Sequence, residues 1–387
     1  MGACFALVAG AAVSFVRSSS LPVRVALVAP SLGILGGQAV QAHRLLHAWH
    51  GDPEIDARLV PVNPVAPWPL AALQRVKYLR TATTQACYWP RLLAALRQAD
   101  VVHVFSASYL SFVLAPWPAV KVARLLGKPV LFNYRSGEAP DHLARSALAR
   151  RTLASADLNV VPSRFLHDVF ANHGIAATVI PNVVDVDRFA FHPRTPLRPR
   201  LLSTRNFEPL YNVACTLRAF RLVQDRYSSA TLVLVGGGSE ETALRELAGR
   251  LRLEGVSFVG RVAPDDIWRH YAAADVYVQS PNIDNMPSSI LEAWASGTPV
   301  VATRAGGVPA ILSDGENGLL APLDDHVAVA RNVLRLLGDP ASATRLAESG
   351  RQSAESYTWP KVRTCWLEAY RALLARPALA AEPLSSQ

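Results

Sequence analysis

Two series of short apolar runs, each run followed by a loop and a helical pattern, constrain the fold of this chain more than any other feature. The first run, residues 23–29, is apolar and β-branched; Pro30, a glycine-rich loop and helical spacing over 38–50 follow it. Such a run is typical of a strand buried on both faces of a parallel sheet. A strand, a glycine loop and a helix in this order predict the opening unit of a doubly wound α/β fold.

The same alternation continues along the chain. In the first half, further strands are predicted at residues 58–62, 101–105, 129–133, 158–161 and 177–180, and helices at 88–98, 113–126, 142–156 and directly after Ser163. A Pro- and Arg-rich stretch at 192–200 follows, through which neither a helix nor a strand can continue. Beyond it, strands are predicted at residues 200–204, 231–235, 256–259, 276–279, 299–302 and 318–320.

These series divide the chain into two α/β domains of similar size. We predict an N-terminal domain at 21–190, a C-terminal domain at 191–360, a C-terminal helix at 361–376 that packs back on the first domain, and a tail at 377–387. Residues 1–20 resemble a weak signal peptide, but no basic side chain precedes their apolar core, so a disordered extension is the favoured interpretation of this leader. A ligand cleft is expected between the domains, at the carboxyl ends of the strands.

Composition excludes several classes of protein. Half of the residues are hydrophobic and 18% are charged, which excludes global disorder. The longest apolar run, residues 5–16, is shorter than the roughly 20 residues that cross a bilayer. The four cysteines form no CxxC pair, which argues against a zinc cluster or a disulfide framework. The chain has no Gly-Lys-Ser/Thr phosphate loop and no complete dinucleotide fingerprint, so ATP and NAD are not expected.

The basic excess of the chain lies in its first half. Residues 1–190 contain 18 Lys/Arg and 10 Asp/Glu, whereas residues 191–387 contain 21 and 20. This asymmetry favours an anionic lipid or phosphate as partner of the first domain, and the alternative explanation is a generally arginine-rich composition, since lysine is rare throughout. Nucleic acid is not expected. Residues 74–91 interleave cations with aromatic side chains, near Trp68, which fits a membrane interface and equally a helix with a solvated basic face. We expect a cytoplasmic protein. The membrane-interface interpretation of residues 74–91 adds peripheral association with the inner face of the cell membrane.

Residues 280–309 carry the strongest chemical signal. The predicted strand ends at Gln279, a loop containing Asp284 follows, and a helix begins near Ser288. Unpaired N–H groups and the helix dipole make such a helix start an anion site suited to a diphosphate. Glu292, one turn into the helix, is placed to accept hydrogen bonds from vicinal ribose hydroxyls, and Asp284 to accept one from a sugar. Taken alone, an acid in the first turns of a helix also has a purely stabilising role.

The run Glu-Ala-Trp-Ala-Ser-Gly-Thr-Pro-Val-Val at 292–301, with a carboxylate eight residues earlier, resembles the hallmark of retaining glycosyltransferase family 4, of the glycosyl transferases group 1. The resemblance covers roughly residues 23–374. Segments at 181–189, 235–238, 258–260, 305–309 and 314–320 also carry it. It implies the α/β fold called GT-B, in which two Rossmann-like, doubly wound domains enclose an interdomain cleft.

The resemblance also implies an activity and a set of site residues. The activity is metal-independent transfer, with retention, of a sugar from a UDP- or GDP-linked donor to a glycan or lipid-linked acceptor, as in polysaccharide biosynthesis, without a cofactor. The implied residues are Arg205, Asp284 and Glu292 in catalysis, Gly36, Gly37, Gly237, Gly260, Met286, Pro287, Ser288 and Ser289 in donor binding, and Arg135 and His142 on the acceptor side. No metal ligands are expected.

This sequence departs from the family pattern at several positions. The first Glu of the family's pair is Asp284, a shorter carboxylate. Residues 210–212, Leu-Tyr-Asn, stand where the family has the Lys of its donor-diphosphate clamp, so only Arg205 of that cationic pair is present. Arg135 stands at the position of a first-domain His, for which His142 is a candidate substitute. The alternative interpretation is therefore a non-catalytic nucleotide-sugar-binding protein or an inactive glycosyltransferase-like subunit.

Overall fold

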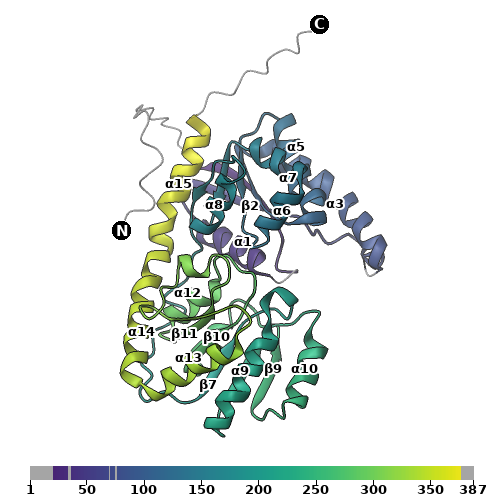
Figure 1. Cartoon of the computed structure of the whole chain (residues 1–387). Coiled ribbons are helices and arrows are strands. Elements are labelled where there is room, and N and C mark those ends of the chain that lie inside the picture. The colour runs from purple at the N-terminus through teal and green to yellow at the C-terminus, as the bar shows by residue number, and fades with distance from the viewer. Residues whose placement is uncertain (1–20, 34–35, 69, 75, 376–387) are drawn as a thin grey trace.

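The computed structural model describes residues 21–33, 36–68, 70–74 and 76–375. These residues form two lobes, each built on a six-stranded parallel sheet with helices packed around it (Figure 1). Two doubly wound α/β units are therefore present, as the strand–helix alternation predicts. The predicted leader at 1–20 and tail at 377–387 lie outside the described residues.

In the first lobe the strand order is β2-β1-β3-β4-β5-β6. The strands are β1 (Val23–Ala29), β2 (Ile55–Pro61), β3 (Val101–Phe105), β4 (Val130–Asn133), β5 (Leu158–Val161) and β6 (Thr178–Val179). The helices are α1 (Gly37–Ala48), α2 (Leu70–Leu73), α3 (Lys77–Gln98), α4 (Tyr109–Leu114), α5 (Pro116–Leu125), α6 (Ala139–Arg145), α7 (Ala147–Ala154) and α8 (Arg164–Ala171). Strands β3 and β4 are buried along their whole length, because helices cover both faces of the sheet.

In the second lobe the strand order is β12-β11-β10-β7-β8-β9. The strands are β7 (Arg200–Ser203), β8 (Thr231–Val235), β9 (Val256–Gly260), β10 (Val276–Gln279), β11 (Val300–Thr303) and β12 (Leu319–Ala321). The helices are α9 (Val213–Arg226), α10 (Glu241–Arg250), α11 (Trp268–Ala273), α12 (Ser288–Ala295), α13 (His326–Gly338) and α14 (Pro340–Ala354), with 3-10 turns at Pro209–Tyr211, Val308–Ala310 and Glu355–Tyr357. The order of strands reverses between β7 and β10, and ligands of open parallel sheets bind at such a switch point.

The last helix, α15 (Trp359–Ala375), returns from the second lobe and packs along the first (Figure 1). Its buried Trp366 and Tyr370 belong to the same apolar cluster as Leu27 of β1 and Trp49 after α1. The Arg363 guanidinium donates to the Asp52 carboxylate at 2.8 Å, which anchors the helix electrostatically. The C-terminal part of the chain thus completes the core of the N-terminal lobe.

Three helices differ from the sequence prediction. The helix predicted at 113–126 is two helices, α4 and α5, that meet at Ala115, because a residue before proline disfavours the α conformation. The helix predicted at 142–156 is divided at Ser146, whose side chain accepts from the Ala149 N–H and caps α7. Helix α3 begins eleven residues before the predicted start at Tyr88 and continues through Pro90. Proline has no N–H to donate to a carbonyl in the preceding turn, but Pro90 lies on the exposed side of the helix, where water can bind that carbonyl instead.

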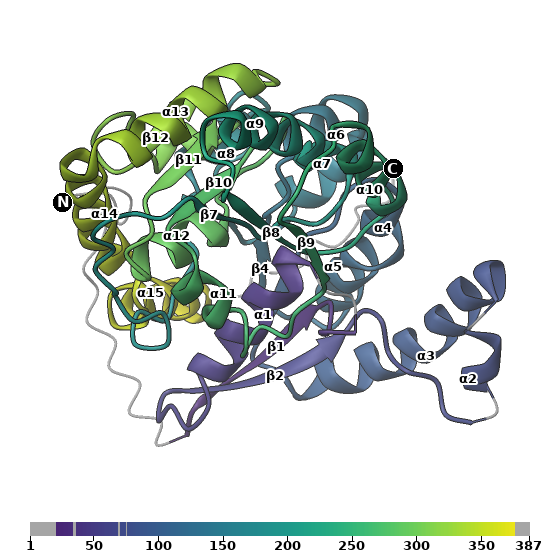
Figure 2. The ribbon, with the colours of Figure 1, turned by 90° about the horizontal axis from the view of Figure 1, so that it is seen from below.

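Helices α2 and α3 extend outward from the body of the first lobe (Figures 1 and 2). Several large apolar side chains of this region are exposed, with Trp68 87% and Val65 77% accessible. No helix within the described ranges combines the length and the apolar character needed to cross a bilayer.

Candidate functional site

A cleft of about 590 Å³ lies between the two lobes, where the carboxyl ends of strands from both sheets meet. Its wall includes Phe105 at the end of β3 and Val235 at the end of β8. The predicted site residues that line it are Gly36, Gly37, Arg135, Arg205, Asp284, Met286, Pro287, Ser288, Ser289 and Glu292. One cleft therefore brings together side chains that lie up to 256 residues apart, from Gly36 to Glu292.

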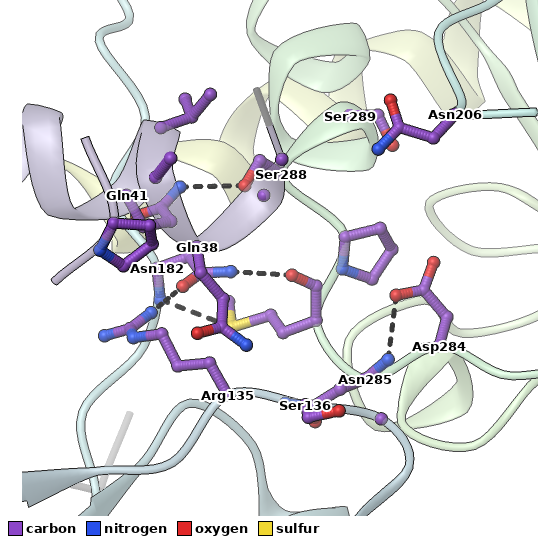
Figure 3. A pocket seen from close by; sticks show the side chains of 18 of the residues that line it. Gln38, Gln41, Arg135, Ser136, Asn182, Asn206, Asp284, Asn285, Ser288 and Ser289 are labelled. Atoms are coloured by element: carbon purple, nitrogen blue, oxygen red, sulfur yellow. Dashed lines mark hydrogen bonds between the residues drawn. The ribbon is translucent and has the colours of Figure 1, made fainter. Parts of the chain in front are cut away.

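The start of α12 forms one side of the cleft. The helix begins at Ser288 after Pro287, and its first turn contains no acidic residue. The N–H groups at such a helix start lack intrahelical acceptors, so they and the helix dipole favour an anion there. Gln41 of α1 reaches across from the first lobe and donates from Nε2 to the Ser288 hydroxyl at 2.8 Å (Figure 3). The helix start is thus held against the opposite lobe at the point where an anion would bind.

Glu292 connects the lobes through a second contact. Its carboxylate lies 2.5 Å from Nη2 of Arg44, also on α1, and both side chains are largely buried. Gln41 and Arg44 are three residues apart and therefore share one face of α1. The acid predicted to bind a ribose consequently faces the interlobe cleft, where a cation from the first lobe orients it.

Arg205 and Asp284 form a buried ion pair on the second lobe. Arg205 follows β7 and Asp284 follows β10, the strands on either side of the switch point. Arg205 Nη2 donates to Asp284 Oδ2 at 2.6 Å, and Nη1 donates to the Ser289 hydroxyl at 3.2 Å. Burial alone would lower the pKa of Arg205, but the Asp284 charge together with the neighbouring Tyr211, Tyr277 and Tyr271 outweighs it, so the pKa lies above its usual value. Arg205 is therefore a permanent cation directed at the start of α12.

Glycine loops bring backbone close to this pair. Gly236 has φ +154° and lies so near the Arg205 carbonyl that a Cβ there would be 2.0 Å from its oxygen, so no larger residue fits. Gly237 and Gly260, predicted donor-binding residues, lie next to Gly236 and Arg261, which line the cleft themselves. An added Cβ at Gly237 would be 3.4 Å from the Arg261 Nε, which places this exposed guanidinium over the glycine loop.

The two predicted acceptor-side residues occupy different environments. Arg135 follows β4 and lines the cleft. His142 on α6 is buried, with 1% of its surface accessible. Its Nδ1 lies 2.8 Å from the Tyr134 hydroxyl and its ring packs against Phe112, while desolvation lowers its pKa. The structure therefore places His142 in the core of the first lobe, apart from the cleft that Arg135 lines.

Several cleft residues were not predicted from the sequence. Arg44 and Gln41 on α1 and Arg261 after β9 line the cleft with Tyr211, whose ring lies 4.1 Å below the Arg205 guanidinium. The i,i+3 pairing of Gln41 and Arg44 downstream of the double glycine was the signal that could have identified the first two. Among the residues that the structure describes, no group of three or more His, Cys, Asp or Glu side chains is placed to hold a metal ion.

Two family profiles match consecutive parts of the chain. The profile described as Glycosyltransferase Family 4 matches residues 35–188, and that described as Glycosyl transferases group 1 matches residues 198–339. The chain belongs to this glycosyltransferase family. The recognition based on the motif at 292–301 is thereby confirmed.

Relatives with assigned activities match over parts of their length. The chain is 26% identical over 301 residues to a sulfoquinovosyl transferase of Arabidopsis thaliana, which is 71% of this chain and 57% of the relative. It is 34% identical over 206 residues to the phosphatidyl-myo-inositol mannosyltransferase of Mycobacterium leprae, which is 51% of this chain and 54% of the relative. The match thus spans a little more than half the length of each.

Solved structures share the arrangement of both lobes. The sucrose-phosphate synthase of Thermosynechococcus elongatus superimposes with a TM-score of 0.72 at 20% identity, over 91% of this chain and 99% of that one. The Anabaena protein HepE, solved in complex with UDP-glucose, gives 0.71 at 17% identity, over 90% and 99%. The predicted GT-B fold is confirmed by this agreement in architecture.

Proposed function

We propose that this protein is a retaining glycosyltransferase that transfers a sugar from a UDP- or GDP-linked donor to a glycan or lipid-linked acceptor without a metal ion or cofactor. The observation that carries the proposal is Glu292, whose carboxylate faces the interlobe cleft one turn below the open start of α12. A diphosphate at Ser288 and Ser289 would place the attached ribose within reach of this acid. Relatives named as GDP-mannose-dependent mannosyltransferases and the UDP-glucose complex of HepE support a nucleotide-sugar donor.

The difficult step of this reaction is the departure of the diphosphate. The bond between the anomeric carbon and the phosphate oxygen breaks, and an acceptor hydroxyl adds to the same face of the sugar while its proton passes to the departing phosphate oxygen. The negative charge that develops on the leaving group would be met by Arg205 and by the N–H groups at the start of α12. Preorganised donors of this kind stabilise a developing anion by roughly 3–4 kcal/mol each. Asp284, fixed by Arg205 and by the Asn285 N–H, would accept a hydrogen bond from the sugar.

The test of this proposal combines binding and turnover. The wild type is expected to bind one nucleotide sugar and transfer its sugar with retention, and Glu292→Ala is expected to weaken that binding by about 10²-fold, since charge-assisted hydrogen bonds to the ribose are lost. Glu316→Ala, which removes an exposed carboxylate of the same lobe, is the matched control and should change neither. Binding without turnover by the wild type would instead establish the non-catalytic alternative. Unchanged binding by Glu292→Ala would contradict the site.

We further propose that the first lobe meets the acceptor at an anionic membrane surface through α2 and α3. The stretch from residue 57 to residue 99 contains six Arg/Lys and no Asp or Glu. Within it, seven large apolar side chains are exposed: Val65, Trp68, Leu70, Leu73, Val76, Leu79 and Trp89. Cations beside exposed tryptophan and leucine suit the boundary between anionic headgroups and acyl chains.

Vesicle co-sedimentation tests this surface. The protein is expected to bind vesicles that contain phosphatidylglycerol and to remain unbound with phosphatidylcholine alone, and binding should weaken at high salt. Trp68→Ala with Leu79→Ala should reduce binding, whereas Leu125→Ala, an exposed leucine on α5 with 86% accessibility, should not. Equal binding to both vesicle types, or equal loss in the Leu125→Ala control, would contradict the proposal. A concentration-dependent dimer abolished by the Trp68 variant would assign the surface to a second copy instead.

A further inference from the structure

Arg135 is held in the cleft by neutral groups alone. Its Nε donates to Asn133 Oδ1 at 2.8 Å, its Nη1 donates to Asn182 Oδ1, and its guanidinium carbon lies 5.6 Å from the centre of the Phe105 ring. Figure 3 shows the side chain extended toward Asn182 on the wall of the cleft. Within the described part of the chain no carboxylate forms an ion pair with it.

The amide groups around Arg135 are fixed in orientation by a longer hydrogen-bonded chain. An arginine has only donors, so both asparagines must turn their oxygens toward it. The Asn133 Nδ2 then donates to His103 Nε2 at 2.9 Å, and the other ring nitrogen of His103 lies 2.8 Å from the Tyr370 hydroxyl of α15. The Asn182 Nδ2 donates to the Met286 carbonyl at 2.6 Å, directly before the start of α12. Arg135 is thus a preorganised cation, set in place from α15 on one side and from the donor loop on the other.

The other arginines that meet buried carboxylates in the cleft are different. Arg44 pairs with Glu292 at 2.5 Å and Arg205 pairs with Asp284 at 2.6 Å, so each neutralises a neighbour within the chain. No carboxylate neutralises the charge of Arg135. Its Nη2 makes no hydrogen bond to the described residues, and this atom is not fully buried. Burial without a nearby carboxylate lowers its pKa. A cation in this state is unfavourable unless an anion arrives to compensate it.

The space beside Arg135 limits where such an anion comes from. A small cavity of about 10 Å³ lies between Arg135, Arg44 and Trp366 of α15. That volume holds one water molecule at most. The main cleft, which Arg135 also lines, has room for a carboxylate, sulfonate or phosphate, and there the donor sugar and the acceptor would meet.

We propose that Arg135 recognises an anionic group, a carboxylate, sulfonate or phosphate, carried either by the transferred sugar or by the acceptor. This inference rests on the proposed function and specifies the substrate class of the same cleft. Arg135 acts by binding that group through Nη2, the one guanidinium nitrogen that makes no hydrogen bond to the described residues.

Matched substrates distinguish the two possible carriers of the anionic group, the transferred sugar and the acceptor. In the donor arm, calorimetry compares UDP-glucose with UDP-glucuronate, or GDP-mannose with GDP-mannuronate if the chain binds guanosine nucleotides; each pair differs by one carboxylate. In the acceptor arm, transfer rates are compared for one glycan acceptor with and without a phosphate. The wild type is expected to prefer the acidic partner in one arm by about 10- to 100-fold. Arg135→Gln should abolish that preference, and Arg135→Lys should keep part of it because the charge remains.

The outcomes distinguish this inference from the proposed function. No preference for the acidic partner in either arm, with normal binding of the neutral one, overturns the role of Arg135 and leaves the glycosyltransferase proposal intact. If Arg135→Gln weakens the binding of UDP or GDP without a sugar as much as that of the acidic nucleotide sugar, the role of Arg135 is overturned too, because Arg135 would then bind the donor diphosphate. Arg304→Gln, which removes an exposed arginine paired with Asp314, is the control and should alter no arm. Absence of any nucleotide or sugar binding refutes both proposals together.

Discussion

The two lobes share one plan but differ in the partners of one cleft arginine each. In the second lobe the buried Arg205 meets the Asp284 carboxylate, and the partly exposed Arg200 meets the buried Asp275. In the first lobe, the buried network of His103, Asn133 and Arg135 contains amide, imidazole and hydroxyl partners and no carboxylate among its hydrogen-bond partners. The Arg205–Asp284 pair is therefore neutralised before any ligand binds, whereas Arg135 in the first lobe has no carboxylate partner, and that lobe also exposes basic, apolar surface.

This difference teaches how one fold serves two tasks. In the proposed donor site, a rigid cation and helix start would receive the diphosphate, and the ion pair within the lobe supplies that rigidity. In the first lobe, the uncompensated charge of Arg135 is available for the recognition proposed above. Contacts from α1 to α12 join the two halves across the cleft.

The largest expected effect comes from breaking the closed pair of the second lobe. Arg205→Ala leaves Asp284 buried without its cation and should lower the free energy of unfolding by about 3–5 kcal/mol. Arg304→Ala breaks the exposed pair with Asp314 in the same lobe and should cost about 1 kcal/mol or less. Urea unfolding of both variants measures the contrast. Equal losses would show that the Arg205 pair is no more important to stability than a surface contact.

Acid should destabilise the first lobe through its neutral histidines. Desolvation lowers the pKa of His103 and of His142 below the unfolded value, so the unfolded chain binds protons that the folded chain does not. The free energy of unfolding is then fully present above about pH 6.5 and falls as the pH drops below it, by up to about 1.4 kcal/mol per pH unit for each histidine.

His103→Gln sharpens this prediction, since glutamine keeps an amide at the centre of the Asn133 and Tyr370 contacts but does not titrate. Urea unfolding at pH 7.5, 6.5 and 5.5 should show a shallower acid dependence for the variant, by up to one proton. Parallel pH profiles for the variant and the wild type would mean that His103 is not the neutral, buried group described above.

The smallest structural change, a small increase in lobe separation, is expected at the contact that joins the lobes. Arg44→Ala removes the ion pair between α1 and Glu292 but leaves the Gln41–Ser288 hydrogen bond. Without ligand, the lobes should separate slightly, and small-angle X-ray scattering should record a larger radius of gyration than in the wild type. Arg371→Ala, an exposed arginine of α15 paired with Glu54, serves as control. An unchanged radius would indicate that α15 and the remaining contacts alone set the lobe geometry.

More of the site in the second lobe than in the first could be predicted from the sequence. Asp284, Ser288 and Glu292 occupy one strand–loop–helix unit, so local spacing was enough to bring them together. Arg44 acquires its role only when α1 meets α12, a contact between residues 248 positions apart that no local pattern encodes. His142 is close in sequence to the cleft residue Arg135, but aromatic rings from α4 and from Tyr134 after β4 enclose it, and their packing follows from tertiary structure.

The broken helices illustrate the same limit. Apolar periodicity across 113–126 is continuous, and only the backbone restriction before Pro116 divides it. The helix predicted from Tyr88 begins earlier, at Lys77, within the stretch 74–91 for which a helix with a solvated basic face was one of two interpretations. Apolar side chains such as Leu79 are exposed in its first turns.

The most direct measurement of the central claim is calorimetric titration of the full chain with UDP, GDP and other nucleoside diphosphates, each alongside its nucleoside. If the start of α12 and Arg205 hold a diphosphate, one nucleoside diphosphate should bind at least tenfold more tightly than its nucleoside. Glu292→Ala should weaken the binding of that nucleoside diphosphate, because the contact with the ribose is lost. Binding of a nucleoside as tight as that of its diphosphate, or no nucleotide binding at all, would contradict the account.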